Sequence, residues 1–176
     1  MRHAAPDNID FLTTPFMALF YLIAAAAVLL DRATKLLAIH YLRDGGLTVV
    51  VAPDWLKLTY AENLGIAFSM RFLPPAGLLA LTLAISAGVV WYVVKSNNRT
   101  PLFLTAFALI LGGGVGNLLD RVMLGHVVDF IYFDLYHGAL FGVPLDLWPV
   151  FNVADSCITV GACMLVLFHD KIFGEA

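Results

Sequence analysis

Long apolar segments separated by shorter polar stretches give the chain its pattern. About 20 consecutive apolar residues are enough to cross a bilayer as a helix. We therefore expect four membrane spans, near residues 14–40, 75–95, 101–122 and 150–169. Pro101 suits the first position of a helix, and Trp91, Tyr92 and Lys95 at the end of the second span are typical of a membrane interface.

The first apolar segment also has features of a secretory signal, because an apolar stretch is followed by small residues. Two observations favour a retained helix. Apolar sequence continues past Lys35, and three further spans follow. We therefore interpret this segment as the first span of a multi-pass protein.

Composition supports a membrane protein. Of the 176 residues, 61% are hydrophobic and only 13% are charged, and the mean hydropathy is +0.87. Soluble domains are about 45–50% apolar and about 25% charged. The length suits one membrane-embedded domain that comprises residues 1–176. The net charge of −3 and the lack of a basic stripe argue against a nucleic-acid partner.

The distribution of basic residues predicts the orientation. Arg2 precedes the first span, Lys171 follows the last, and Lys95 and Arg99 flank a short turn. Dense positive charge in short segments marks the cytoplasmic side, so we expect both termini in the cytoplasm. Four antiparallel spans then bring most polar residues capable of chemistry to the opposite, outer face, which also carries the connection 43–74.

Two aspartates at that face are the candidate catalytic residues. Asp155 is the only formal charge between Val150 and Phe168, where an ionised group costs about 2.5–3.5 kcal/mol at the centre of a span. Asp129 lies in the apolar sequence that follows Gly125. Two neighbouring carboxyl groups that cannot both ionise share one proton. Such a pair provides the base and the acid that peptide hydrolysis needs.

The polar neighbours of this pair have structural as well as functional interpretations. Asn117 and Arg121 lie four residues apart and share a helix face. Asn152 is either the cap of the fourth helix or a hydrogen-bond donor to the pair. Asp120 either pairs with a cation or is a charge at a helix end in the membrane interface.

The two cysteines, Cys157 and Cys163, both lie in the last span. Each residue of a helix turns by about 100°, so the two side chains point in different directions. We expect no disulfide between them and interpret both as small buried apolar side chains.

Four sequence motifs occur in a fixed order: DRATK at 31–35, ENLGIAFS at 62–69, GGGVGNLLDRVMLGHVVDFIYF at 112–133 and FNVADS at 151–156. They resemble the motifs of lipoprotein signal peptidases, the signal peptidase II family. The resemblance covers nearly the whole chain.

The resemblance implies an aspartyl endopeptidase of the bacterial cytoplasmic (inner) membrane, with Asp129 and Asp155 as catalytic pair. Its fold would be all-α, with four transmembrane helices, and would carry a small β-like platform and a short amphipathic helix on the extracytoplasmic side, in the connections 43–74 and 132–148. It would remove the signal peptide of diacylglyceryl-modified prolipoproteins just before the lipidated cysteine. We expect a monomer that contacts membrane lipid and needs neither cofactor nor metal.

The resemblance also assigns supporting residues. Those that would bind substrate or support the pair are Asn63, Gly65, Asn117, Arg121 and Asn152. Those with a structural role near the site would be Asp31, Lys35, Glu62 and Asp120, of which Asp31 and Lys35 form an i,i+4 pair.

Alternative functions remain open at this stage. A proton-coupled transporter also buries a carboxylate in a helix, although transporters place their sites near the bilayer midplane between repeats. A non-catalytic membrane scaffold is a further alternative. His126 with Asp120 and Asp129 is a conceivable metal site. The chain contains no G-x-S-x-G motif and no H-E-x-x-H motif.

Overall fold

The computed structural model describes residues 15–65, 73–134, 137–140, 143–146 and 149–174. The helices are α1 (Pro15–Leu37), which continues into the π-helical η1 (Ala38–Asp44), then α2 (Pro75–Lys95), α3 (Pro101–Leu124), α4 (Val153–Leu167) and α5 (His169–Phe173). The strands are β1 (Val49–Ala52), β2 (Leu56–Asn63), β3 (Val127–Phe133), β4 (His137–Leu140) and β5 (Val143–Asp146).

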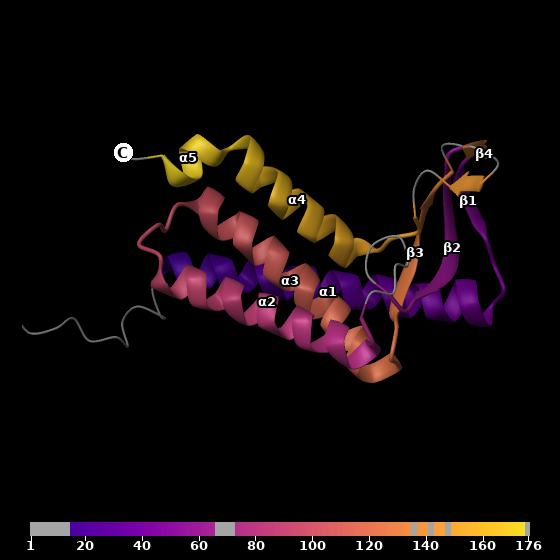
Figure 1. Ribbon diagram of the computed structural model, residues 1–176, viewed down its shortest axis with the longest axis horizontal. Helices are drawn as coiled ribbons and strands as arrows, with labels where there is room; N and C mark the ends of the chain where they lie inside the picture. Colours follow the sequence, from indigo (N-terminus) through magenta and orange to yellow (C-terminus); the bar gives the residue numbers. More distant parts are fainter. Residues whose placement is uncertain (1–14, 66–72, 135–136, 141–142, 147–148, 175–176) are drawn as a thin grey trace, which may run out of the picture.

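Helix α3 is the central helix, and it packs against α1, α2 and α4 (Figure 1). Small residues let these helices approach closely, as the sequence predicts. A Cβ atom added at Gly112 would lie 2.7 Å from the Cβ of Ala27 on α1. One added at Gly161 of α4 would lie 2.6 Å from the carbonyl oxygen of Ala106 on α3.

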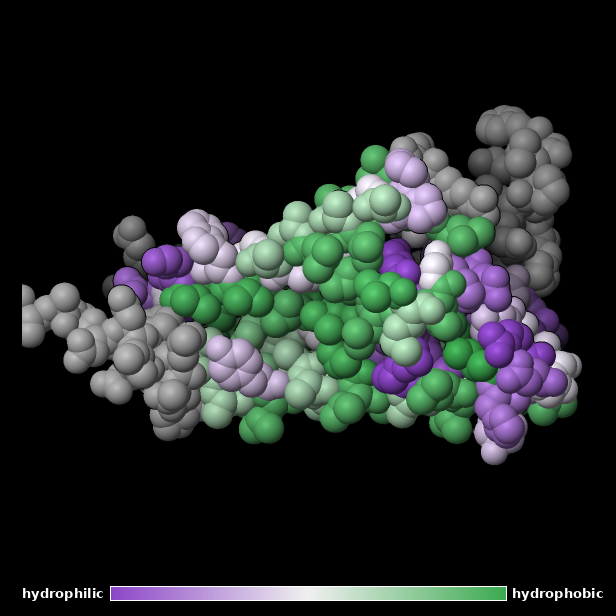
Figure 2. Space-filling view, turned by 90° about the horizontal axis from the view of Figure 1, so that it is seen from below, coloured by the Kyte–Doolittle hydropathy of each residue, from purple (hydrophilic) through white to green (hydrophobic). Residues whose placement is uncertain are grey.

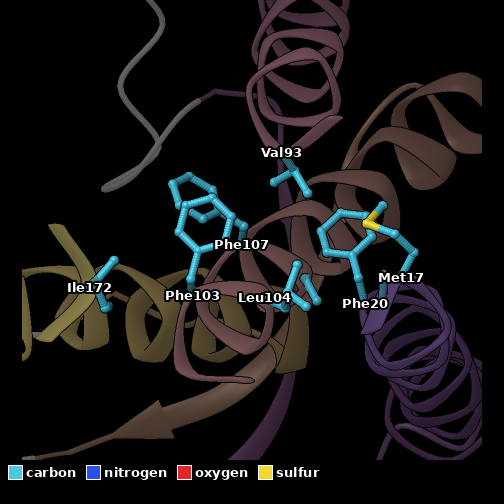
Figure 3. Packing of buried hydrophobic residues seen from close by; sticks show 9 residues of the cluster. Met17, Phe20, Val93, Phe103, Leu104, Phe107 and Ile172 are labelled. Atoms are coloured by element: carbon cyan, nitrogen blue, oxygen red, sulfur yellow. The ribbon is translucent and has the colours of Figure 1, made fainter. Parts of the chain in front are cut away.

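A cluster of buried apolar side chains joins the helices at the end that includes the α2–α3 turn (Figure 3). The cluster combines Met17 and Phe20 of α1 with Val93 of α2 and Ile172 of α5. From α3 it includes Phe103 and Phe107, whose ring centroids lie 4.7 Å apart. Side chains from four helices therefore fix this end of the molecule without any charged group in the cluster.

The outer surface of the helices is apolar. Figure 2 shows hydrophobic residues along the helices and a concentration of hydrophilic residues toward the sheet. Among the described residues, α2 and α3 are long and apolar enough to cross a membrane, by length and composition. Helix α4 is a shorter apolar helix of 15 residues.

Strands β1, β2 and β3 form an antiparallel sheet in that order, and β4 and β5 form a separate hairpin. The sheet lies at one end of the helices (Figure 1). It confirms the β-like platform that the family resemblance implied, so the chain is mainly helical rather than all-α. The described parts of the connections 43–74 and 132–148 contain no separate helix, and the rest of them lies outside the described residues.

The fourth helix begins later than residue 150, where the sequence analysis placed it. Helix α4 starts at Val153 because Asn152 caps it, and Phe151 pairs with Ile131 of β3 instead. Asp155 consequently lies in the first turn of α4. This position near the start of the helix agrees with the expectation that Asp155 lies close to one face with the other polar residues.

Candidate active site

Asp129 is placed by the turn that ends α3. Gly125 adopts the left-handed conformation at φ 80°, which favours glycine, and its N–H donates to the Arg121 carbonyl. The chain then reverses into β3, where Asp129 lies opposite Ala61 of β2. The Asp129 side chain is buried. Burial, together with the nearby charge of Asp155, raises the pKa of Asp129 to about 7.

Asp155 is placed by the start of α4. The side-chain oxygen of Asn152 accepts the Asp155 N–H at 2.9 Å, and Asp155 Oδ2 accepts the Asn152 N–H at 3.2 Å. This reciprocal pair is a capping box. The positive end of the helix dipole favours a carboxylate at this position.

Three asparagines surround the two carboxylates, and every carboxylate oxygen has an N–H donor. Asp129 Oδ1 accepts from Asn152 Nδ2 at 2.7 Å, and Asp129 Oδ2 accepts from Asn63 Nδ2 at 3.1 Å. Asp155 Oδ1 accepts from Asn117 Nδ2 at 2.8 Å. Asn152 is thus both a cap and a donor to the pair. The pair is held in a fixed arrangement by groups from β2, α3 and α4.

Arg121 and Gly65 hold one of these asparagines in place. Arg121 donates to the carbonyl oxygens of Gly65 at 3.2 Å and Asn117 at 3.3 Å. The Gly65 N–H donates to Asn63 Oδ1 at 2.9 Å, which turns the amide nitrogen of Asn63 toward Asp129. The guanidinium therefore fastens the end of β2 to α3 beside the carboxylates.

A cavity of about 150 Å³ lies next to this group. Its walls are formed by Asn63, Leu64, Pro75, Ala76, Leu78, Leu79, Arg121 and Gly125. Most of these residues are apolar, and the polar ones belong to the carboxylate surroundings. The cavity therefore offers an apolar space that reaches the edge of the candidate site.

Lys35 lies at the centre of a buried ionic network behind the pair. Its ammonium is fully buried and lies 2.9 Å from each of Asp31 Oδ2, Asp120 Oδ2 and Asn117 Oδ1. Asp120 Oδ1 also accepts from Arg32 at 3.1 Å. The predicted pair of Asp31 and Lys35 is confirmed. Asp120 pairs with cations, and the alternative of a charge in the membrane interface is wrong because Asp120 is buried.

Among the described contacts, Glu62 makes none with the two carboxylates. Its side chain is half exposed, accepts a hydrogen bond from Tyr60 at 3.0 Å and lies 3.6 Å from His126 Nε2. The part of the chain that the structure describes contains no group of three His, Cys, Asp or Glu residues able to hold a metal ion. His126, Asp120 and Asp129 therefore do not converge on a metal site.

The cysteines are both free. The prediction that they form no disulfide is confirmed. Cys157 is half-buried, but Cys163 is exposed, so its assignment as a buried side chain was wrong. The reason is that one face of α4 packs on α3 while the other faces outward.

Sequence reasoning missed Arg32 and the contact between Lys35 and Asn117. Arg32 lies in the DRATK motif, next to Asp31. It is one of the two cations that pair with Asp120, and the other is Lys35. Lys35 and Asn117 lie 82 positions apart. No local pattern indicates their contact, because it depends on how α1 packs against α3.

Comparisons with known proteins find similar chains. The family model described as signal peptidase (SPase) II matches residues 23–170. A lipoprotein signal peptidase of Chlorobaculum tepidum is 85% identical over 157 residues, which cover 89% of this chain and 97% of the relative. That of Chlorobaculum parvum is 62% identical, covering 89% of this chain and 98% of the relative. That of Brevibacillus brevis is 36% identical, covering 84% of this chain and 92% of the relative.

Solved structures with the same fold exist. Two structures described as a bacterial membrane enzyme are each 29% identical to this chain. One superimposes with a TM-score of 0.71 and covers 89% of this chain and 91% of its own. The other superimposes with a TM-score of 0.73, and the match covers 89% of this chain and 95% of that structure's chain.

Proposed function

The chain belongs to the signal peptidase II family, and we propose that Asp129 and Asp155, the dyad, are the catalytic residues of this peptidase. The observation that carries the proposal is the bridging of the two carboxylates by Asn152, whose side chain donates to one and whose backbone N–H donates to the other. Membership of a peptidase family argues against the transporter and the scaffold.

The dyad accounts for peptide hydrolysis without any added group. Near neutral pH the two carboxyl groups share one proton, since burial and the Asp155 charge raise the pKa of Asp129 to about 7. The ionised carboxylate takes a proton from water, and the neutral one gives its proton to the carbonyl oxygen as the water oxygen bonds to the carbonyl carbon. The aspartate that is now ionised takes a hydroxyl proton from the resulting diol, the C–N bond breaks, and the aspartate that is now neutral protonates the leaving amine.

The proposed substrate is a diacylglyceryl-modified prolipoprotein, cleaved just before the lipidated cysteine. The names of the relatives support a lipoprotein precursor. A dyad near one end of the helices reaches a peptide bond only when that bond is held at the same depth. A diacylglyceryl group would hold it there, because each buried methylene contributes about 0.8 kcal/mol. The apolar cavity beside Arg121 lies where part of such a substrate could enter.

We further propose that α1, α2, α3 and α4 all cross the cytoplasmic membrane. Exposed apolar side chains on all four helices support four spans. Helix α4 is only about 22 Å long at 1.5 Å per residue, so α5 and the residues before Asn152 would complete its crossing. The distribution of basic residues supports an orientation with both termini in the cytoplasm and with the sheet and dyad at the outer face. In this proposal one chain, as a monomer, contains the complete site.

One experiment tests the substrate. Purified enzyme is incubated with a precursor peptide that carries diacylglycerol on its cysteine and with the same peptide lacking the lipid. Cleavage is expected to fall steeply without the lipid. Equal turnover of both peptides contradicts the lipoprotein substrate while leaving the aspartyl mechanism intact.

A second experiment tests the orientation. Single cysteines placed in the α2–α3 turn and in the β1–β2 turn, in a Cys157→Ala/Cys163→Ala background, are labelled with a membrane-impermeant reagent in intact cells. Labelling of the β1–β2 position alone is expected. Labelling of the α2–α3 position alone reverses the proposed orientation.

A further inference from the structure

Two buried carboxylates of the helices accept hydrogen bonds from the backbone directly before each member of the dyad. Asp120 Oδ2 accepts the Val128 N–H at 3.0 Å. Asp31 Oδ1 accepts the Ala154 N–H at 2.9 Å. The next residue along the chain is a dyad aspartate in both cases. The helices thus anchor both segments that carry the dyad, although one segment is a strand and the other is a helix start.

Lys35 joins these two anchors. Its ammonium lies 2.9 Å from Asp31 Oδ2 and 2.9 Å from Asp120 Oδ2. Its third N–H donates to Asn117 Oδ1 at 2.9 Å. An ammonium has three donors, and here each has an acceptor. Because the side chain is fully buried, no water replaces a partner that is lost.

The contact with Asn117 fixes the direction of an amide that touches the dyad. Asn117 Oδ1 accepts from Lys35 and from Asn152 Nδ2 at 3.1 Å, so this atom faces two donors. Only the amide nitrogen is then left to face Asp155, which it meets at 2.8 Å. A rotated amide would place its NH₂ group against the ammonium and its oxygen against a carboxylate. Lys35 therefore excludes the rotated orientation.

We propose that Lys35 is a positioning residue for the dyad. It fixes the Asn117 amide as a donor to Asp155, and through Asp31 and Asp120 it fixes the spacing of the two backbone segments that carry the dyad. This inference rests on the proposed role of Asp129 and Asp155 as catalytic residues.

Arg32 provides a matched control. It is a second cation on the same helix and pairs with the same Asp120 carboxylate, at 3.1 Å through Oδ1. Among the described contacts it makes none with Asn117 or with Asp31. Its removal changes the charge of the network by the same amount as removal of Lys35, but leaves the Asn117 amide oriented.

The test compares Lys35→Met with Arg32→Met, using the lipidated precursor peptide and rates normalised to folded protein from thermal melting. Misplacement of about 1 Å can reduce a rate about 100-fold. We expect a loss of that order in kcat for Lys35→Met, with KM changed by less than about threefold, because the lost interaction orients the reacting groups. Arg32→Met should keep kcat within about threefold of the parent while melting at a lower temperature.

Removing one partner of a buried ion pair leaves an uncompensated buried charge, which can prevent folding. If Lys35→Met does not fold, the double variant Asp31→Asn/Lys35→Met tests the inference instead. It removes one negative and one positive charge, and the Asn oxygen still accepts the Ala154 N–H. The same loss of kcat is expected because Asn117 Oδ1 again lacks the charged donor, which leaves Asn152 Nδ2 as its one described donor.

Parental kcat in folded Lys35→Met, or in the double variant, overturns the inference. Equal loss of kcat in Lys35→Met and Arg32→Met also overturns it, since the charge of the network would then be the cause. Asp155→Asn separates this result from the proposed function. If it is inactive while Lys35→Met has parental kcat, only the role of Lys35 fails. If folded Asp155→Asn cleaves the precursor, the dyad itself is refuted.

Discussion

Asn152 donates its side-chain N–H to Asp129 across 2.7 Å, although the two residues lie 23 positions apart in the chain. The same side chain caps α4 by accepting the Asp155 N–H at 2.9 Å. One amide therefore uses its oxygen to start the helix that carries one aspartate and its nitrogen to bind the other. The two interpretations of Asn152 that the sequence left open are both correct.

These two roles of Asn152 can be separated by mutation. Asn152→Ser keeps a cap, since Ser is among the preferred residues there, but its side chain is too short to reach Asp129. We expect Asn152→Ser to melt near the parental temperature. Its kcat should fall about tenfold or more, because a hydrogen bond to a charged group contributes about 1.5 kcal/mol. Asn152→Ala should lose the same activity and about 1 kcal/mol of stability in addition.

Thermal melting and precursor cleavage on the same preparations provide the measurement. Parental activity in Asn152→Ser would show that the donor to Asp129 is dispensable, and that Asn152 acts through the helix start alone.

The sequence predicted the position of the site better than its internal contacts. The expectation of antiparallel helices was enough to bring Asp129 and Asp155 together, and the structure confirms that the residues around both aspartates form one cluster. Contacts that depend on helix packing were not accessible, because Lys35 and Asn117 come from helices whose spacing no local pattern specifies. Apolar periodicity also placed the start of α4 too early, since Phe151 is as apolar as the helix but pairs with β3.

The position of Asp155 has a local explanation. The sequence shows it as the only formal charge between Val150 and Phe168. The capping box with Asn152 places it in the first turn of α4. A polar residue three positions before an acidic one is the local signal for such a start, and it outweighs the hydropathy of the surrounding residues.

Replacement of either dyad residue by Asn should abolish cleavage without preventing folding. Asn has nearly the shape of Asp, but its amide can neither accept the proton of water nor return one. We expect Asp129→Asn and Asp155→Asn each to lose at least about 1000-fold in kcat, and the double variant to be scarcely worse, because residues that act as a unit are non-additive. Cleavage assays on folded, purified variants measure this. Independent, multiplicative losses would argue against a shared proton.

The cysteines should be dispensable. Cys157 and Cys163 are both free, and neither is hydrogen-bonded to the dyad among the described contacts. The double variant Cys157→Ala/Cys163→Ala is expected to retain activity within about twofold of the parent, with or without reductant, since small buried or lipid-facing apolar side chains contribute little to orientation. Loss of cleavage in the folded double variant would require a thiol in the mechanism.

The raised pKa of Asp129 predicts how stability depends on pH. The folded protein holds the Asp129 proton up to about pH 7, whereas the unfolded chain releases it near 3.8. Between these values the folded state binds more protons, so raising the pH lowers the free energy of unfolding. Each pKa unit corresponds to about 1.4 kcal/mol, so this one group can remove up to about 4 kcal/mol between pH 4 and pH 7. Above pH 7 its contribution no longer changes.

Asp129→Asn lacks this proton, so its melting temperature in detergent should fall less than the parent's between pH 4 and pH 7.5. Asp170→Asn is the control. It removes one carboxyl group that is fully exposed on α5 and lies outside the dyad. The melting curves of parent, Asp129→Asn and Asp170→Asn are compared at several pH values across this range. If the melting temperatures of the parent and Asp129→Asn change equally with pH, Asp129 does not retain a proton in the folded protein. That result would contradict a dyad that shares one proton.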